Sequence, residues 1–302
     1  MMKGIFANDE KLIKALKITV TVVIILEVAL GFLGWLMGTH LYMYALTVTC
    51  LGGLSLTIFH GISMYGKRNV IIIIIIGMGI SLLFESLGCN FGFLFSKYTY
   101  TGYIPGPKLF GFDVFSMIGY GCAAYELWAL GQAAVGMFEN RFKKWDVLVV
   151  PIISGLLFVS IDFGTDPLLA TITGAYDWVQ PGVYYGVPYQ NYLGWIVMAI
   201  CMMFCISLLL YPQQKKGMLP PTPSVAKKKW FWRAPVLIYG ALFIQMPFYA
   251  LITENQEVTV YSGQTFMTHD IYWGVCLVYM GAILVPSLII LARISRSVEL
   301  ED

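Results

Sequence analysis

The 302-residue chain is 58% hydrophobic and only 12% charged, with a mean hydropathy of +0.74 and a formal net charge of +2. Because a soluble domain carries about a quarter charged residues, this composition excludes a soluble fold. Long apolar runs, without a pattern of short alternating segments, predict an all-α, polytopic integral membrane protein.

Eight apolar segments are predicted to cross the bilayer as helices. The first is too long for the core of a signal peptide and no small-residue cleavage site follows it, so we expect a permanent span. In chain order the predicted spans are 18–38, 41–65, 70–88, 112–138, 147–163, 192–211, 234–252 and 271–291.

The basic residues predict the orientation of these spans. With the amino terminus inside, the cytoplasmic segments hold every Lys and Arg except Lys97 and Lys108. One span more or fewer would destroy this bias, so the positive-inside rule supports about eight helices with both termini cytoplasmic. The run Lys227–Lys229 fits the same topology signal better than a nucleic acid site. We therefore expect a multi-pass protein of the cytoplasmic membrane, in contact with lipid and without a nucleic acid partner.

The chain divides into three predicted parts. Residues 1–211 form a six-helix membrane domain that carries the outer-face motifs, and residues 234–302 form two further transmembrane helices and a tail. Between them, residues 212–233 are rich in Pro and Lys, a composition typical of a solvated cytoplasmic tether.

Two outer segments resemble each other at an offset of 75 residues, as their letters show. Phe110-Gly111-Phe112-Asp113, followed by Gly119-Tyr120, aligns with Tyr185-Gly186-Val187-Pro188, followed by Gly194-Trp195. Each copy leads from an aromatic-Gly turn into a predicted helix. Aromatic and Gly residues recur at membrane interfaces in any case, but the match also predicts a duplicated cradle in parallel orientation, with two halves around one site.

Acidic residues within predicted spans are candidates for function, because a charge in the membrane is costly. Glu27 and Glu126 lie deeper in their spans, and for each we expect a hydrogen bond to a neighbouring helix. The other acids within spans, Glu85, Asp113 and Asp162, gather at the outer level, where Asp166 and Asp177 join them at the surface. No basic residue lies within a span to neutralise them.

Asp162 and Asp166 are four residues apart and share one helix face if the helix continues through Gly164 as far as Asp166, although Gly164 and the following Pro167 disfavour such a continuation. Burial and a like-charged neighbour favour the protonated form of one carboxyl group in such a pair, while the other can remain ionised. This division of protons is what general acid and base catalysis requires.

Aromatic residues surround these acids in the outer segments. An aromatic belt at the membrane interface accounts for many of them, yet ring faces also stabilise a cation and can line a groove for a long polyene. The set comprises Tyr98, Tyr100, Tyr103, Tyr120, Tyr176, Trp178, Tyr184, Tyr185, Tyr189 and Trp195.

No metal site or other cofactor site is predicted. The six cysteines show no paired spacing, and His40, His60 and His269 are too few for a membrane di-iron centre. The sequence also contains no nucleotide-binding loop.

The outer motifs resemble the carotenoid-biosynthesis membrane protein family that contains the carotenoid 1,2-hydratases and bisanhydrobacterioruberin hydratase. The resemblance covers about residues 55–211, and its most specific part is the stretch YYGVPYQNYLGW, residues 184–195. Asp113 and Tyr120 depart from the Pro and Trp expected by their match to Pro188 and Trp195. The other motifs are Glu85-x-x-Gly88-x-x-x-Gly92, Tyr98-x-Tyr100, Gly106-Pro107 and Asp166-Pro167.

This resemblance implies hydration of a terminal isoprenoid double bond at an acyclic carotenoid end, giving a tertiary alcohol without a cofactor. Asp166 or Asp162 would be the acid, Glu85 the base or water-orienting group, and Asn191 a positioning residue. Trp178, Tyr185 and Trp195 would form a wall that stabilises the cation, and Tyr100 and Tyr120 are further substrate-binding candidates. The expected partners are the long apolar polyene, membrane lipid and other enzymes of the carotenoid pathway.

Two other functions stay open. The intramembrane acids could serve a transporter coupled to protons or cations, although they cluster at one face and form no path across. Non-covalent binding of a carotenoid is the second alternative, because every Lys lies in a loop or terminus and covalent retinal needs a Lys within a helix.

Overall fold

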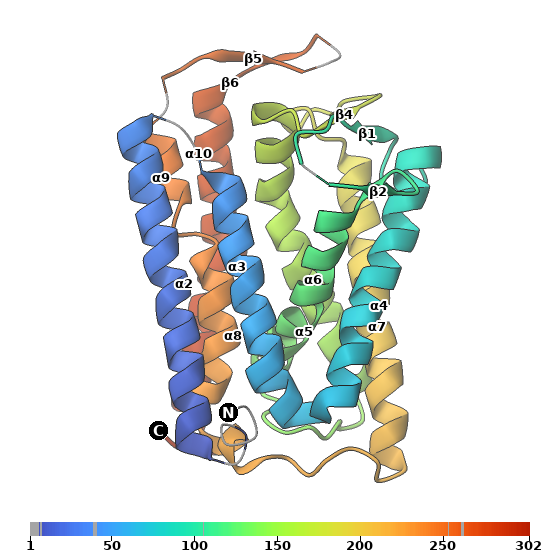
Figure 1. Ribbon diagram of the computed structural model, residues 1–302, viewed down its shortest axis with the longest axis vertical. Coiled ribbons are helices and arrows are strands. Elements are labelled where there is room, and N and C mark those ends of the chain that lie inside the picture. Colours follow the sequence, from blue (N-terminus) through green and yellow to red (C-terminus); the bar gives the residue numbers. More distant parts are fainter. Residues whose placement is uncertain (1–5, 7, 39–40, 105, 253, 261–262) are drawn as a thin grey trace.

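The computed structural model describes residues 6, 8–38, 41–104, 106–252, 254–260 and 263–302, so that Lys3 and His40 lie outside the described residues. A bundle of long helices stands upright, with short strands across one end (Figure 1). The helices are α2 (Asp9–Met37), α3 (Tyr42–Leu56), α4 (Ile62–Phe91), α5 (Val114–Val135), α6 (Asp146–Asp166), α7 (Tyr189–Lys215), α8 (Lys229–Ala241), α9 (Met246–Ile252), α10 (Thr268–Tyr279) and α11 (Val285–Arg296).

Within the described residues, six helical segments are long and apolar enough to cross a membrane. One of them, Tyr42–Phe91, makes two passes: Gly66 leaves the helical conformation at φ 78°, and α3 and α4 run in opposite directions (Figure 1). The eighth pass is α5, most of whose residues are buried by neighbouring helices. The prediction of an all-α polytopic membrane protein with about eight spans is confirmed.

Small residues let the central helices α4 to α7 approach closely, which is how packing is achieved where lipid removes the hydrophobic drive between helices. A Cβ atom on Gly77 of α4 would lie 3.0 Å from the Cα of Gly121 in α5. Likewise, a Cβ on Gly155 of α6 would lie 2.9 Å from the backbone nitrogen of Ile200 in α7. These contacts fix the distances between the helices that carry the acidic residues.

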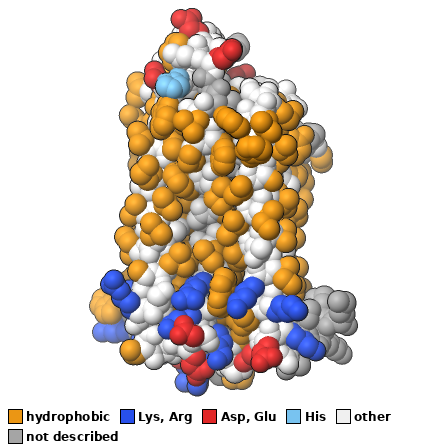
Figure 2. Space-filling model, turned by 90° about the vertical axis from the view of Figure 1, so that its left-hand side faces the viewer, with side chains coloured by type: hydrophobic (Ala, Val, Ile, Leu, Met, Phe, Trp, Pro, Cys, Tyr) orange, Lys and Arg blue, Asp and Glu red, His pale blue; other side chains and the backbone are white. Residues whose placement is uncertain are grey.

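The distribution of apolar and basic side chains on the surface is typical of a membrane protein. Hydrophobic side chains cover the middle of the molecule, and Lys and Arg gather at the lower end (Figure 2). The beginning of α2 and the carboxy terminus lie at that end (Figure 1). By the positive-inside rule this is the inner end, and the strands therefore lie outside.

Among the described residues, the outer end carries three two-stranded antiparallel sheets. In the first, β1 (Tyr98–Tyr100) pairs with β4 (Tyr176–Trp178), so that Tyr98 lies opposite Trp178 and Tyr100 opposite Tyr176. The others pair β2 (Lys108–Leu109) with β3 (Phe112–Asp113), and β5 (Glu257–Thr259) with β6 (Thr265–Met267). The first sheet joins the outer loop before α5 to the outer loop before α7.

The sequence repeat is also a repeat of the backbone. Phe110 and Tyr185 have φ angles of 51° and 50°, and Gly111 and Gly186 both have 85°. Both turns lead into helices whose first residues, Val114 and Tyr189, keep the same offset. The two helical hairpins, α4–α5 and α6–α7, are therefore parallel copies, as the sequence predicts.

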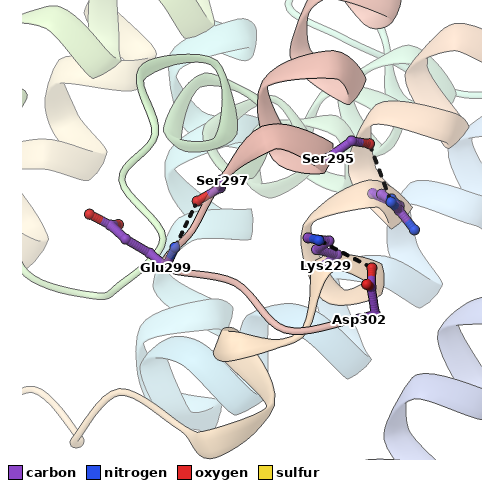
Figure 3. Close-up of polar contacts among 6 residues, drawn as sticks. Lys229, Ser295, Ser297, Glu299 and Asp302 are labelled. Atoms are coloured by element: carbon purple, nitrogen blue, oxygen red, sulfur yellow. Dashed lines mark hydrogen bonds and ion pairs between the residues drawn. The ribbon is translucent and has the colours of Figure 1, made fainter.

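The inner end is more ordered than the tether expected over 212–233. Helix α7 continues to Lys215, and Val225 and Ala226 are buried. Near the carboxy terminus, Lys229 pairs with Asp302 at 3.2 Å, and the Ser297 hydroxyl accepts a hydrogen bond from the backbone of Glu299 (Figure 3). The chain end is thus attached to the beginning of α8.

Candidate active site

The site centres on the carboxyl groups of Asp162 and Asp166, both 5% exposed. Helix α6 continues without a break to Asp166, and a π-helical turn over Pro167–Ile172 follows. The two side chains therefore share one face and contact each other. Asn191, in the first turn of α7, donates hydrogen bonds from Nδ2 to both, at 3.3 Å from Asp162 Oδ2 and at a shorter distance from Asp166 Oδ2.

Glu85 faces this pair from the outer part of α4 and is 3% exposed. Its Oε2 accepts a hydrogen bond from the Tyr98 hydroxyl, and Oε1 accepts one from the Tyr120 hydroxyl at 3.5 Å. Its two oxygens are thus each held by a phenol. The carboxyl groups of both hairpins meet in one cavity.

An aromatic lid, formed by Tyr98 and Tyr100 of β1 with Tyr176 and Trp178 of β4, covers the carboxyl groups. The rings of Tyr98 and Trp178 lie 4.7 Å apart, and the Tyr176 hydroxyl donates to Asp166 Oδ1. Burial, followed by the nearby carboxylates, raises the pKa of both Tyr98 and Tyr176 well above the ordinary value. Both phenols therefore stay protonated and act as hydrogen-bond donors to the acids.

The wall below the lid comes from equivalent positions of the two hairpins. Tyr120 of α5 and Trp195 of α7, which match in the sequence repeat, lie edge to face with ring centroids 5.2 Å apart. Phe158 of α6 lies 5.6 Å from Trp195. The predicted duplicated cradle thus brings both halves to one site.

A larger groove joins the cavity on its inner side, and Tyr120, Asp162 and Trp195 line both spaces. Thr57, which directly follows α3, lies close to α5, and its Oγ1 is 3.3 Å from the carbonyl oxygen of Cys122. Residues of both α3 and α5 line the groove, and among them is Phe115 of α5, which is 48% exposed. Since both helices cross the membrane, the groove opens toward lipid.

The structure brings together most of the residues singled out from the sequence. The cavity lining includes Glu85, Tyr100, Tyr120, Asp162, Asp166, Trp178, Asn191 and Trp195. Tyr185 lies outside the cavity. The centroid of its ring is 6.2 Å from that of Phe266 in β6, and its hydroxyl lies beside Gly274 of α10. The backbone of Tyr185 forms the aromatic-Gly turn of the repeat, and this turn directs its side chain away from the cavity.

Asp113 also lies outside the cavity. Its Oδ1 accepts a hydrogen bond of 2.8 Å from the backbone nitrogen of Ser116 and caps α5, while the matching Pro188 precedes α7. Asp residues are favoured at this position because they satisfy a free N–H of the first turn. A capping role accounts for this acidic residue in the outer cluster.

The direct contacts of Tyr98 and Tyr176 with the acids were missed by sequence reasoning. Strands of three residues give too short a pattern to be recognised, so their pairing across the two loops had no local signal. Among the described residues, no group of three or more His, Cys, Asp or Glu side chains is arranged to hold a metal ion.

The two deeper glutamates differ from each other. Glu27 accepts hydrogen bonds from Thr49 at 2.9 Å and from Gln245 at 2.7 Å, as expected for a contact between helices. Glu126 makes no hydrogen bond within the described part of the chain and lines the groove, so the interhelical bond expected from the sequence is wrong for it. The close approach of Gly53 leaves space for its side chain but offers no partner.

Comparison with known protein families gives a match over most of the chain. The model of a family described as carotenoid biosynthesis protein matches residues 40–267, a wider range than the motifs around the site alone. No curated protein and no solved structure gives a significant match.

Proposed function

We propose, because the chain belongs to the carotenoid biosynthesis protein family, that it adds water across a terminal double bond of an acyclic carotenoid. One observation carries the proposal: a buried pair of carboxyl groups lies at the end of an apolar groove that opens toward lipid. A polyene dissolved in the bilayer can enter such a groove sideways. Its terminal carbons then reach the acids without passing through water.

Asp162 is assigned as the proton donor, since it is the carboxyl group of the pair that lines both the cavity and the groove. Asp166 is held by Tyr176 and Asn191, which only donate hydrogen bonds to it and so suit the ionised form. One proton shared by two adjacent carboxyl groups gives the pair an acid and a base together.

The reaction balances without a cofactor. The proton of Asp162 adds to the less substituted carbon of the terminal double bond, and the positive charge develops on the tertiary carbon. Tyr120 and Trp195 present aromatic surfaces where such a charge is stabilised. Water, oriented by Glu85, adds to the tertiary carbon, and the proton it releases restores the carboxyl pair.

This assignment places the site near the outer face of the cytoplasmic membrane. The transporter alternative has less support: in the described residues, Glu85, Asp162 and Asp166 meet at the outer end, and Glu27 is engaged with Thr49 and Gln245. Simple carotenoid binding would also use the groove, but it would not require a carboxyl pair at the end.

Pigment analysis of variants tests the proposal. In a bacterial host that makes an acyclic carotenoid, the wild-type chain should yield a tertiary alcohol, and Asp162→Asn should lower its formation by about 10²- to 10⁴-fold. Asp166→Asn should also abolish detectable hydration, because the pair then lacks the ionised carboxylate that takes back the proton released by water.

Asp177→Asn is the matched control. Asp177 lies on β4 between Tyr176 and Trp178, pairs in register with Thr99, and does not line the cavity. Its replacement should leave hydration unchanged. Full activity of both Asp162→Asn and Asp166→Asn, at equal levels of folded protein, would remove the carboxyl pair from the mechanism.

A further inference from the structure

Glu126 is a buried acid without a protein partner. Its side chain, in the middle of α5, is 6% exposed and borders the inner part of the groove. It makes no hydrogen bond with any described residue, and the groove lining contains no Lys or Arg. A carboxyl group buried without a partner loses its hydrogen bonds to water, a cost that proteins normally avoid.

The comparison with Glu27 indicates that this is not a general property of acids in this bundle. Glu27 is even less exposed, at 1%, and both of its oxygens accept hydrogen bonds from neighbouring helices. The Glu126 carboxyl group instead faces a space whose other walls are mainly apolar. Its hydrogen-bonding capacity is therefore directed to whatever occupies the groove.

Position along α5 relates Glu126 to the reacting end. It follows Tyr120 by six residues, which corresponds to about 9 Å along the helix axis. Tyr120 borders both the cavity and the groove. A short segment of an isoprenoid chain therefore spans the distance between the carboxyl pair and Glu126.

In an apolar groove without a neighbouring cation, the neutral carboxylic acid is the form that fits, and it both donates and accepts a hydrogen bond. A hydroxyl group is the complementary partner. We propose that Glu126 binds a hydroxyl group on the isoprenoid chain, so that the groove selects ligands already oxygenated near the reacting end. This inference rests on the proposed function only for the identity of the chain as an isoprenoid.

It also gives the protein a place in a reaction sequence. The preferred substrate would be the product of an earlier reaction that introduced a hydroxyl group, either a hydration or a hydroxylation. An unmodified hydrocarbon would bind more weakly, because its contact would leave Glu126 without a partner.

Binding to purified protein tests the inference, with quenching of tryptophan fluorescence as the readout, since Trp195 lines the groove. Two probes of equal length are compared: an acyclic hydrocarbon carotenoid and its counterpart with a tertiary hydroxyl group near one end. Wild-type protein should prefer the hydroxylated probe by about tenfold. Glu126→Leu should lose this preference, and Glu126→Gln should keep it, because the amide also donates and accepts.

Glu27→Gln is the matched control and should leave the preference unchanged, since Glu27 lies outside the groove lining. A preference that persists in folded Glu126→Leu, or equal binding of both probes to the wild type, would overturn the inference.

Repeating the titration with Asp162→Asn separates the two proposals. A Glu126-dependent preference there, together with no hydration by the wild type, would leave the inference standing and defeat the proposed function. Hydration by the wild type without a preference for the hydroxylated probe would support the proposed function and overturn the inference about Glu126.

Discussion

At the residue scale, the environment of each acid decides its role more than its position in the sequence does. Asp113 and Asp162 both reach the outer level, but one caps α5 and the other lines the cavity. Glu27 and Glu126 both lie in membrane-spanning helices, but only Glu27 finds partners on neighbouring helices. The sequence could identify the set of acids, whereas their division into structural and reactive groups depends on contacts between helices.

Tyr176 permits a test of the lid. Its hydroxyl donates to Asp166, and its ring packs on Tyr98 and Trp178. Tyr176→Phe keeps the ring and removes the donor, so turnover should fall by about tenfold while the yield of folded protein stays the same. Product formation per folded protein, in a host that supplies the carotenoid, measures the effect.

Tyr103→Phe provides the control for this measurement, because Tyr103 is 48% exposed and lies outside the cavity lining. Equal losses in the two variants, or no loss in Tyr176→Phe, would contradict a positioning role for the Tyr176 hydroxyl.

At the element scale, the duplicated hairpin was the most informative feature of the sequence. The aromatic-Gly turns and the helix starts recur at the predicted offset, and the equivalent residues Tyr120 and Trp195 meet at one site. The sequence could not decide whether α6 continues past Gly164, because Gly and Pro commonly end a helix. In the structure α6 reaches Asp166, and Pro167 begins a π-helical turn that a sequence pattern does not reveal. The pairing of β1 with β4 had no sequence signal, because strands of three residues are too short to show a recognisable pattern.

Packing between α6 and α7 should control activity as well as stability. Gly155→Val would place a Cβ 2.7 Å from Ile200 Cγ1 and 2.9 Å from the Ile200 backbone nitrogen, and overpacking of this kind costs about 1–3 kcal/mol. Because Asn191 on α7 bridges the acids on α6, hydration should fall together with the melting temperature.

Gly79→Val is the matched control, since a Cβ on Gly79 would meet no atom within 4 Å. Thermal unfolding and pigment analysis of the two variants should separate them. A Gly155→Val protein as stable and active as Gly79→Val would show that this contact does not position the site.

At the scale of the whole molecule, composition was sufficient for the fold class, while the orientation stays a prediction from the positive-inside rule. All-α topology, about eight passes and a basic inner end agree with the structure (Figures 1 and 2). The proposed division into residues 1–211 and 234–302 stays a prediction, and the structure shows contacts across it: Tyr279 of α10 donates a 2.5 Å hydrogen bond to Ile161 of α6. A hydropathy pattern indicates which segments cross the membrane, but it does not indicate which polar groups of distant helices, such as those of Tyr279 and Ile161, contact each other.

The origin of the oxygen atom in the product tests the central claim most directly. Cells that express the chain and make an acyclic carotenoid would be supplied with water labelled with heavy oxygen, and the pigments analysed by mass spectrometry. Addition of water predicts a product heavier than the substrate by one labelled water molecule, with its double bond lost and the label in a tertiary hydroxyl group. A product whose oxygen comes from dioxygen, or a carotenoid that accumulates unchanged in the presence of folded protein, would contradict the account.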